Sequence, residues 1–242
     1  MRLAAVNYNS NSRYFVKRSE IIRILSIIVI AVGAVLMALE IIIQFDTWAV
    51  MSAGVMLTAA GAAMYVFDSG RRMKDTEFDE VIRKAISAMP SKIENRMAED
   101  RIRVKETNRY EFMTFDLDAD GVLIKKGSDG ALRSSRVSYA SVICGMTDKH
   151  PCVAVYKNSF SVTEPYEADS IYMLYEEQLK DVEFDVSGYE TADICGKKIT
   201  AEKARVRITF DEDSAIDFPV KNDASVDEFI SMMKRICQKN RK

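Results

Sequence analysis

The chain has 242 residues, 48% of them hydrophobic and 29% charged, and its formal net charge is −2. This charge excludes a general electrostatic attraction to nucleic acid. The composition is that of a folded domain joined to a smaller apolar part, and the four cysteines contain no CxxC pair that would place two zinc ligands in one loop.

The first 23 residues form a polar and basic N-terminal arm. Residues 1–12 end in a run of Asn and Ser and have no hydrophobic period, which predicts a mobile segment. We expect the first helix to begin between Tyr14 and Arg23. The arm contains five cations and the single acid Glu20. Such a segment is suited to anionic lipid headgroups as well as to fixing membrane topology.

Residues 24–67 form the most informative stretch, because two apolar segments follow one another with only four residues between them. The segments 24–43 and 48–67 each hold twenty residues, enough to cross a hydrocarbon core of about 30 Å as helices. The short connection, 44–47, requires the second helix to turn straight back. The sequence therefore predicts a transmembrane helical hairpin and a lipid bilayer as its first partner.

The orientation of this hairpin follows from the cations around it, since Lys and Arg accumulate on the cytoplasmic side. The connection between the segments has no cation and carries Asp46. Both chain ends are therefore predicted to be cytoplasmic, in a cell membrane protein with two spans. The flanking cations that carry this prediction are Arg13, Lys17, Arg18, Arg23, Arg71, Arg72 and Lys74.

Each apolar segment has one face of small or polar residues, which allows helices to approach closely. These faces contain Ser26, Gly33 and Glu40 in the first segment and Gly54, Thr58 and Gly61 in the second. We expect the two faces to pack against each other, with self-association of several hairpins as the alternative. Glu40 lies about one turn from the connecting loop, where snorkelling to interfacial water accounts for it without a proton or ion relay.

Residues 68–108 are predicted to be a helical connector. Phe78, Ile82, Ala85 and Met89 follow a helical period, so one face of this helix is apolar. Pro90 is expected to end or kink the helix, and Ser91 with Glu94 resembles a capping box that starts a second one.

From residue 109 the hydrophobic period becomes that of strands. The clearest pair is 205–210 and 216–220, joined by a polar turn at 211–214, and a helix with one apolar face follows from Ser225. Other short strands are expected at 110–117, 122–126, 137–144, 153–156, 171–175 and 182–186. The fold class is therefore α+β, with a mainly antiparallel, partly open barrel closed by a C-terminal helix.

The run Glu111–Val142, a strand, an Asp-Gly turn, a second strand and then Val-Ser-Tyr-Ala-Ser-Val, resembles bacterial pleckstrin-homology-like (PH-like) domains. The terminal hairpin and helix, Ala204–Cys237, are similar too. Members of this group are often joined to paired membrane helices. The resemblance implies a PH-like domain over 109–242 with a scaffolding or regulatory function, and it transfers no binding residue; the longer, acidic stretch 156–196 leaves the strand order there open.

Two readings of the acidic residues near Gly121 compete with a plain hairpin turn. Asp116, Asp118 and Asp120 match the start of a calcium-binding EF-hand loop, but the twelfth position is Gly127 where Glu is required. Asp118 and Asp120 also match the nucleophile motif of haloacid-dehalogenase-type phosphatases, whose following helices and parallel strands are not predicted here. We expect Asp120-Gly121 to be a hairpin turn.

A last group of reactive residues contains Cys144, His150, Cys152 and Cys195, which lack the spacing of a zinc site. The sequence thus predicts no catalytic residue, metal or cofactor. It predicts a non-enzymatic membrane protein that holds a PH-like binding domain at the inner face of the membrane, with a protein partner, its own copies or anionic lipid as ligand. The alternatives are a membrane-bound, magnesium-dependent phosphatase using Asp118 and Asp120, and a small transporter formed by several hairpins.

Overall fold

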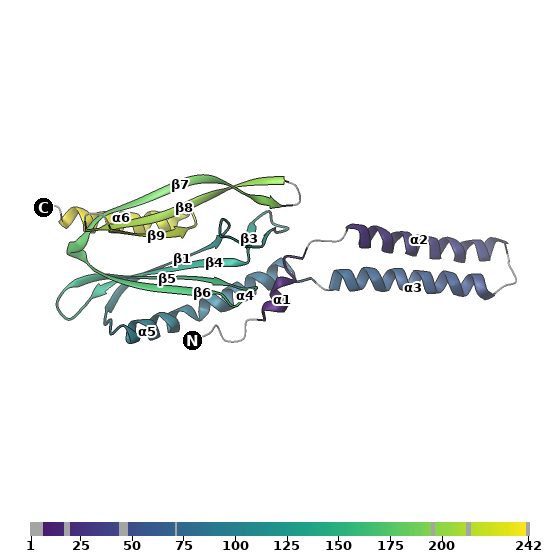
Figure 1. Cartoon of the computed structure of the whole chain (residues 1–242), viewed down its shortest axis with the longest axis horizontal. Coiled ribbons are helices and arrows are strands. Elements are labelled where there is room, and N and C mark those ends of the chain that lie inside the picture. The colour runs from purple at the N-terminus through teal and green to yellow at the C-terminus, as the bar shows by residue number, and fades with distance from the viewer. Residues whose placement is uncertain are drawn as a thin grey trace. The chain divides into compact units, whose positions relative to one another are not determined.

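The computed structural model describes residues 7–16, 20–43, 48–70, 72–194, 197–211 and 214–240. The chain forms two compact units, Arg13–Lys74, called the helix pair below, and Met1–Ser12 together with Asp75–Lys242, called the β-domain. Figure 1 labels the elements of both units.

The helix pair consists of α2 (Glu20–Ile43) and α3 (Trp48–Gly70). Both are uninterrupted because neither contains proline and both are rich in residues that tolerate an apolar helix. Within them, Ile21–Ile42 and Trp48–Asp68 are long and apolar enough to cross a membrane. The two predicted apolar helices are therefore confirmed as helices, while the predicted turn at 44–47 lies outside the described residues.

The prediction of a mobile arm is wrong for residues 8–12. These form a short helix, α1 (Tyr8–Ser12), in which Asn11 is buried and its side-chain amide donates a 2.9 Å hydrogen bond to the carbonyl of Val162. This long-range bond fixes a segment that has no hydrophobic period. The first apolar helix, α2, begins at Glu20, within the predicted range 14–23, and a turn at Arg13–Phe15 precedes it.

Two amphipathic helices open the main part of the β-domain, α4 (Asp75–Ser87) and α5 (Met89–Glu99). The predicted capping box at Ser91 is wrong, because α5 already begins at Met89 with Ala88 as its N-cap and no side-chain cap. Pro90 occupies the first turn, where its missing N–H has no intrahelical acceptor in any case. Proline here starts a helix and does not end one.

Four antiparallel strands form the first sheet in the order β1-β4-β5-β6. They span Lys105–Asp116, Arg136–Met146, Pro151–Ser161 and Glu167–Tyr175. The three-stranded sheet β7-β8-β9 contains Leu179–Ile194, Lys197–Phe210 and Ser214–Val220, and follows the 3-10 turn η1 (Glu176–Gln178). The C-terminal helix is α6 (Ala224–Asn240).

The turn at Asp120-Gly121 is present, and Gly121 adopts a φ of 73°, which glycine reaches without steric strain. The prediction that it joins two paired strands is wrong. β1 pairs with β4, whereas the strand after the turn, β2 (Ile124–Lys126), pairs with the unpredicted β3 (Leu132–Ser134). The segment between β1 and β4 is thus a small hairpin inserted into the sheet connection.

The main core lies between the two sheets and α6. Phe229 of α6 lies with its ring centroid 5.3 Å from that of Phe112, which stacks on Phe218 of β9 at 5.7 Å. These side chains belong to one buried cluster that includes residues from both sheets and the helix. The C-terminal helix therefore closes the space between the sheets, as the apolar face starting at Val226 predicts.

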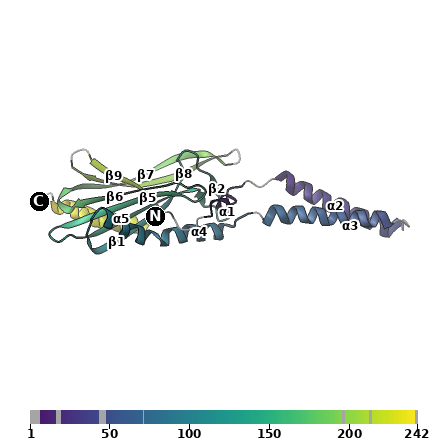
Figure 2. The same ribbon diagram turned by 60° about the horizontal axis from the view of Figure 1, so that its bottom comes forward.

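The outer face of the four-stranded sheet is also covered. α4 and α5 lie beside it on the side away from β7–β9 (Figures 1 and 2). Phe78 of α4 is fully buried and stacks on Phe115 with centroids 6.3 Å apart, and Tyr139 and Ile143 of β4 are buried although they lie outside the main core. The segment predicted as a connector is therefore, from Asp75 onward, a third layer of the β-domain.

Candidate functional site

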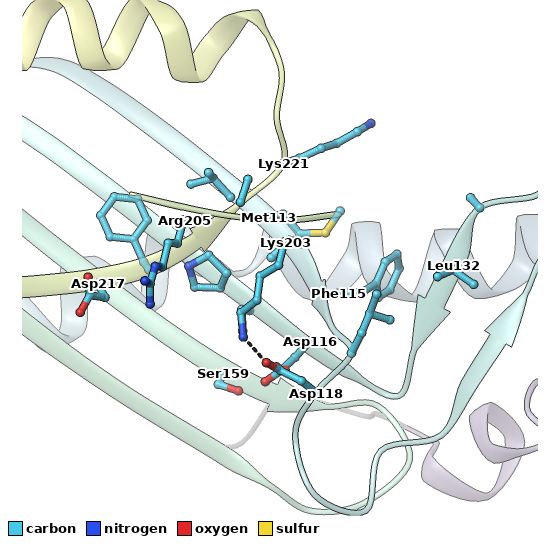
Figure 3. Close-up of a pocket in the computed structure, with 18 residues that line it drawn as sticks. Met113, Phe115, Asp116, Asp118, Leu132, Ser159, Lys203, Arg205, Asp217 and Lys221 are labelled. Atoms are coloured by element: carbon cyan, nitrogen blue, oxygen red, sulfur yellow. Dashed lines mark hydrogen bonds and ion pairs between the residues drawn. The ribbon is translucent and has the colours of Figure 1, made fainter. Parts of the chain in front are cut away.

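A cleft of 590 Å³ is lined by the end of β1, the middle of β8 and the end of β9. Its apolar lining includes Met113, Phe115, Leu132 and Phe218, and charged side chains line its mouth (Figure 3). The mixture of an apolar wall and a few convergent polar groups is the usual composition of a ligand site. We call this space the inter-sheet cleft.

An acidic pair and a lysine meet at the mouth of the inter-sheet cleft. The Lys203 ammonium donates to the Asp118 carboxylate, and Figure 3 shows Asp116 beside this pair. Burial, and next a hydrogen bond with Asp118, raise the pKa of Asp116, whereas the bond from Lys203 lowers the pKa of Asp118. Asp116 therefore keeps its proton to a higher pH than Asp118, and the lysine neutralises the remaining charge.

The other charges at the cleft come from β8, β9 and the residue after β9. Arg205 pairs with Asp185 at 3.2 Å, and Asp217 lies 3.9 Å from Arg207. Lys221 is exposed and forms no ion pair with a described residue. The cleft thus has one unpaired cation at its rim and no large excess of either charge.

A second cavity of 230 Å³ continues the space toward β6 and shares Ser138, Ser159 and Phe218 with the cleft. The register pairs Ser138 with Ser159 and Lys157 with Ser170, so these polar groups follow one another across β4, β5 and β6. On the inner face of the four-stranded sheet, the side chains are therefore apolar in the main core and carry hydroxyl groups near Ser138 and Ser159. The arrangement is suited to holding a polar ligand by hydrogen bonds.

The two residues of the phosphatase alternative lie in different surroundings. Asp118 is engaged by Lys203, and Asp120 is exposed in the turn and does not line the cleft. Both sheets that follow the motif are antiparallel. A nucleophilic carboxylate needs an open path to phosphorus and a neighbouring acid; Asp118 has Asp116 beside it, but Lys203 binds its carboxylate.

The calcium reading finds no support in the described residues, among which no group of three or more His, Cys, Asp or Glu is placed to hold a metal ion. Gly127, where an EF-hand loop needs a bidentate Glu, lies instead in a tight contact. A Cβ at this position would lie 2.2 Å from a guanidinium nitrogen of Arg133 and 2.6 Å from the Asp129 carboxylate. The glycine leaves room for that ion pair.

The cysteines do not form a common site. Cys144 pairs with Val153 in the β4–β5 register and faces the main core, so the adjacent Cys152 points to the opposite face of the sheet. Burial raises the pKa of Cys144 to about 12 and also raises that of Cys152. His150 is exposed, with its ring edge-to-face against Tyr175, and Cys195 lies outside the described residues.

The predicted small-residue faces of the helix pair lie against each other. A Cβ on Gly33 would lie 2.4 Å from Thr58 Oγ1 and 2.7 Å from the carbonyl of Gly54, and one on Gly61 would lie 2.9 Å from the carbonyl of Ser26. Backbone contact this close requires glycine. Ser26 is fully buried and donates to the Arg23 carbonyl, which satisfies its hydroxyl.

Arg23 lies in the first turn of α2 and Glu40 in its last turn. Glu40 is half-buried, and its Oε2 atom is enclosed without a hydrogen-bond partner among the described residues. Arg13 and Lys74 lie in the segments before and after the helices. Arg72 pairs with Asp68 at 2.7 Å, so part of its charge is compensated. Lys17, Arg18 and Arg71 lie outside the described residues.

The sequence did not identify Lys203 and Arg133, two cations that form ion pairs with acidic residues of the β-domain. Each meets its partner across many residues of chain, Lys203 at Asp118 and Arg133 at Asp79. No local spacing could have found these pairs, because they depend on how β8 and α4 lie against the β1–β4 connection. No protein-family model, curated protein or solved structure matches this chain.

Proposed function

We propose that the chain is a non-enzymatic integral membrane protein in which the helix pair anchors the β-domain as a binding module. The observation that carries this proposal is the surface of the helices. Ile24, Val35 and Ile42 of α2 and Met56 and Val66 of α3 are at least half exposed. Large apolar side chains exposed along two full-length helices require a lipid environment, since water would not tolerate such an area.

The proposed orientation places both chain ends and the β-domain on the cytoplasmic side. Cations flank both outer ends of the helix pair, and the loop between the helices has none. This asymmetry supports the orientation through the preference of Lys and Arg for the cytoplasmic side. Trp48 beside the loop is suited to the opposite headgroup region.

We further propose that the β-domain is PH-like. A four-stranded antiparallel sheet followed by a three-stranded sheet and a closing C-terminal helix supports this assignment. The β2–β3 hairpin and the layer formed by α4 and α5 are additions to that plan. The layer formed by α4 and α5 covers the outer face of the four-stranded sheet, whereas Leu132 of the β2–β3 hairpin lines the inter-sheet cleft, which stays the candidate ligand site.

The proposed ligand is a protein in preference to a bare lipid surface. Residues 68–242 contain 29 basic and 33 acidic side chains, a balance that does not favour anionic lipid. The ion pairs and the Ser138 and Ser159 hydroxyls of the inter-sheet cleft are suited to a polar ligand without high charge. No observation on the described residues favours catalysis or transport over binding.

Extraction of cell membranes tests the anchor. The full chain should stay in the membrane pellet in alkaline carbonate and enter solution only with detergent. Alkaline carbonate releases proteins held at the surface by charge, whereas two apolar helices are held by the lipid itself. A variant with Leu25→Lys and Val32→Lys in α2 is the matched control, and it should lose membrane retention. Release of the natural chain by carbonate alone would remove the basis of the proposal.

Cross-linking in intact membranes tests the binding role. A photo-reactive residue at Ser159 in the inter-sheet cleft should give a discrete adduct with another protein, whereas one at exposed Lys239 of α6 should not. Recovery of the uncross-linked monomer alone from both positions would count against a partner at the cleft.

A further inference from the structure

A groove of 1200 Å³ in the β-domain lies between the end of α5 and the end of β4. Residues 101–105, which lead from α5 into β1, form its wall. Gly145 allows this wall to lie close to the sheet, since a Cβ there would lie 2.4 Å from the carbonyl of Lys105. We call this space the α5 groove.

The floor of the α5 groove is apolar. Ile143 of β4 is buried, Met97, Ile102 and Val104 are half-buried, and the side chain of Met146 is 48% exposed. These side chains form a continuous lining from the helix to the sheet. Apolar residues of a ligand would be removed from water here.

The wall presents cations in a strand-like alternation. Arg101, Arg103 and Lys105 are exposed, while Ile102 and Val104 between them turn inward. None of the three cations forms an ion pair with a described residue, in contrast to the neighbouring Arg109, which binds Glu106 at 2.6 Å. The lining also contains the acids Glu94, Glu106 and Asp148, of which Glu106 pairs with Arg109, so the three cations of the wall outnumber the two remaining acids.

Arg101 also adopts a conformation that its residue type disfavours. Its φ is 56°, in the left-handed region, at the position after a helix that usually holds glycine. The backbone closes the helix with bonds from Ile102 to Met97 at 2.7 Å and from Arg101 to Ala98 at 3.2 Å. Glycine would fit this turn better, so the presence of arginine points to a role for its side chain.

We propose that the α5 groove binds an extended acidic segment of a partner protein, in which acidic and apolar residues alternate. Residues two apart in an extended chain are separated by about 7 Å, and Arg101, Arg103 and Lys105 likewise stand two residues apart in the sequence. Carboxylates at alternate positions of the ligand would therefore meet the three cations, and the apolar residues between them would face Ile102 and Met97. This inference rests on the proposed role of the β-domain as a binding module and adds a partner class.

The test uses the full chain in nanodiscs of neutral lipid and a fluorescein-labelled octapeptide of alternating Glu and Leu, with binding followed by fluorescence anisotropy. We expect saturable binding that weakens in high salt and is absent for empty nanodiscs and for the Lys-Leu analogue. The double variant Arg103→Ala with Lys105→Ala should bind about tenfold more weakly. Arg235→Ala with Lys239→Ala, two exposed cations of α6, should leave the affinity unchanged.

Arg101→Gly separates recognition from folding. The substitution relieves the left-handed strain, so the thermal midpoint of the β-domain should rise, while the loss of one cation should weaken peptide binding about threefold. A purely structural role for Arg101 would leave the peptide affinity at the natural value.

Two results would overturn the proposal: the Glu-Leu peptide fails to bind, or it binds the double variant as tightly as the natural chain. If the natural chain is an oligomer and the double variant is a monomer, the groove is occupied by a second copy of the chain, and the assignment to a partner protein is wrong. Retention of the chain in carbonate-washed membranes is measured separately, so failure of the groove is distinguishable from failure of the anchor.

Discussion

Arg133 joins two separate elements of the β-domain through one side chain. Its guanidinium donates two bonds of 2.7 Å to Asp79 of α4 and two of 2.9 Å to Asp129 in the β2–β3 turn. The side chain is 7% exposed, whereas the two carboxylates are about half exposed. A planar guanidinium suits this double bidentate contact, and a lysine could not replace it.

Replacing Arg133 should destabilise the β-domain. For Arg133→Gln we expect a loss of about 2 kcal/mol in unfolding free energy, since several charge-assisted hydrogen bonds are lost at once. Chemical denaturation followed by far-UV circular dichroism measures it. Arg83→Gln is the control, because its pair with Glu80 is exposed and should contribute little. Equal stability of both variants would contradict this role of Arg133.

The same contact gives the stability a pH dependence. The bond from Arg133 lowers the pKa of Asp129 from 3.8 to about 2. A carboxyl whose pKa is lower in the folded state stabilises the fold above its unfolded pKa, and this contribution is lost as the pH falls from 3.8 toward 2. Part of the acid-induced loss of stability should therefore be absent in Arg133→Gln.

Cys144 should be chemically inert in the folded protein. Burial holds its pKa at about 12, so the reactive thiolate is scarce at neutral pH. Iodoacetamide at about pH 8 should leave Cys144 unmodified in the native chain and modify it after denaturation, as read by peptide mass spectrometry. Rapid modification of the native protein would show that this thiol is accessible.

At the scale of single elements, the close contact of α2 and α3 depends on glycine. Gly33→Leu should separate the helices and weaken the pair by about 1–3 kcal/mol, because the carbonyl of Gly54 leaves no space for a side chain. Trp48 is the only tryptophan of the chain, so its fluorescence during titration with dodecyl sulfate reports on the pair. Ala34→Leu, on an exposed position of α2, is the control.

Hydrophobic period predicted the elements that pack by one apolar face. The alternation of Val206, Ile208 and Phe218 and the face of α6 both appear in the main core. Period could not predict β3, whose three residues are too few to repeat, nor α1, which is held by the side-chain amide of Asn11. The prediction that Pro90 ends or kinks a helix was wrong because proline is equally suited to the first turn of a helix, where it stands in α5.

The candidate site was less predictable than the elements that form it. Asp116 and Asp118 attracted attention through a local motif, yet their partner Lys203 comes from β8 and only the packed sheets bring them together. The α5 groove was unpredictable for the same reason, because Ile143 of β4 comes to lie beside residues from the end of α5 only in the folded domain. Contacts between distant strands carry no signal in a single sequence.

At the scale of the whole molecule, an apolar helix pair and a β-domain with its own core form separate units of one chain. Their division of roles follows from their surfaces. The helices expose apolar side chains, and the β-domain buries its apolar residues and offers a cleft and a groove. These surfaces support the proposed role of a membrane-anchored binding module.

The measurement that tests this account most directly is the topology of the helix pair in intact cells. Single cysteines at Ser10, Thr47 and Asn240, in a chain whose natural cysteines are replaced by Ser or Ala, are treated with a membrane-impermeant maleimide. Thr47→Cys should react in intact cells, while Ser10→Cys and Asn240→Cys should react only after permeabilisation. Labelling of Asn240→Cys in intact cells would contradict the account.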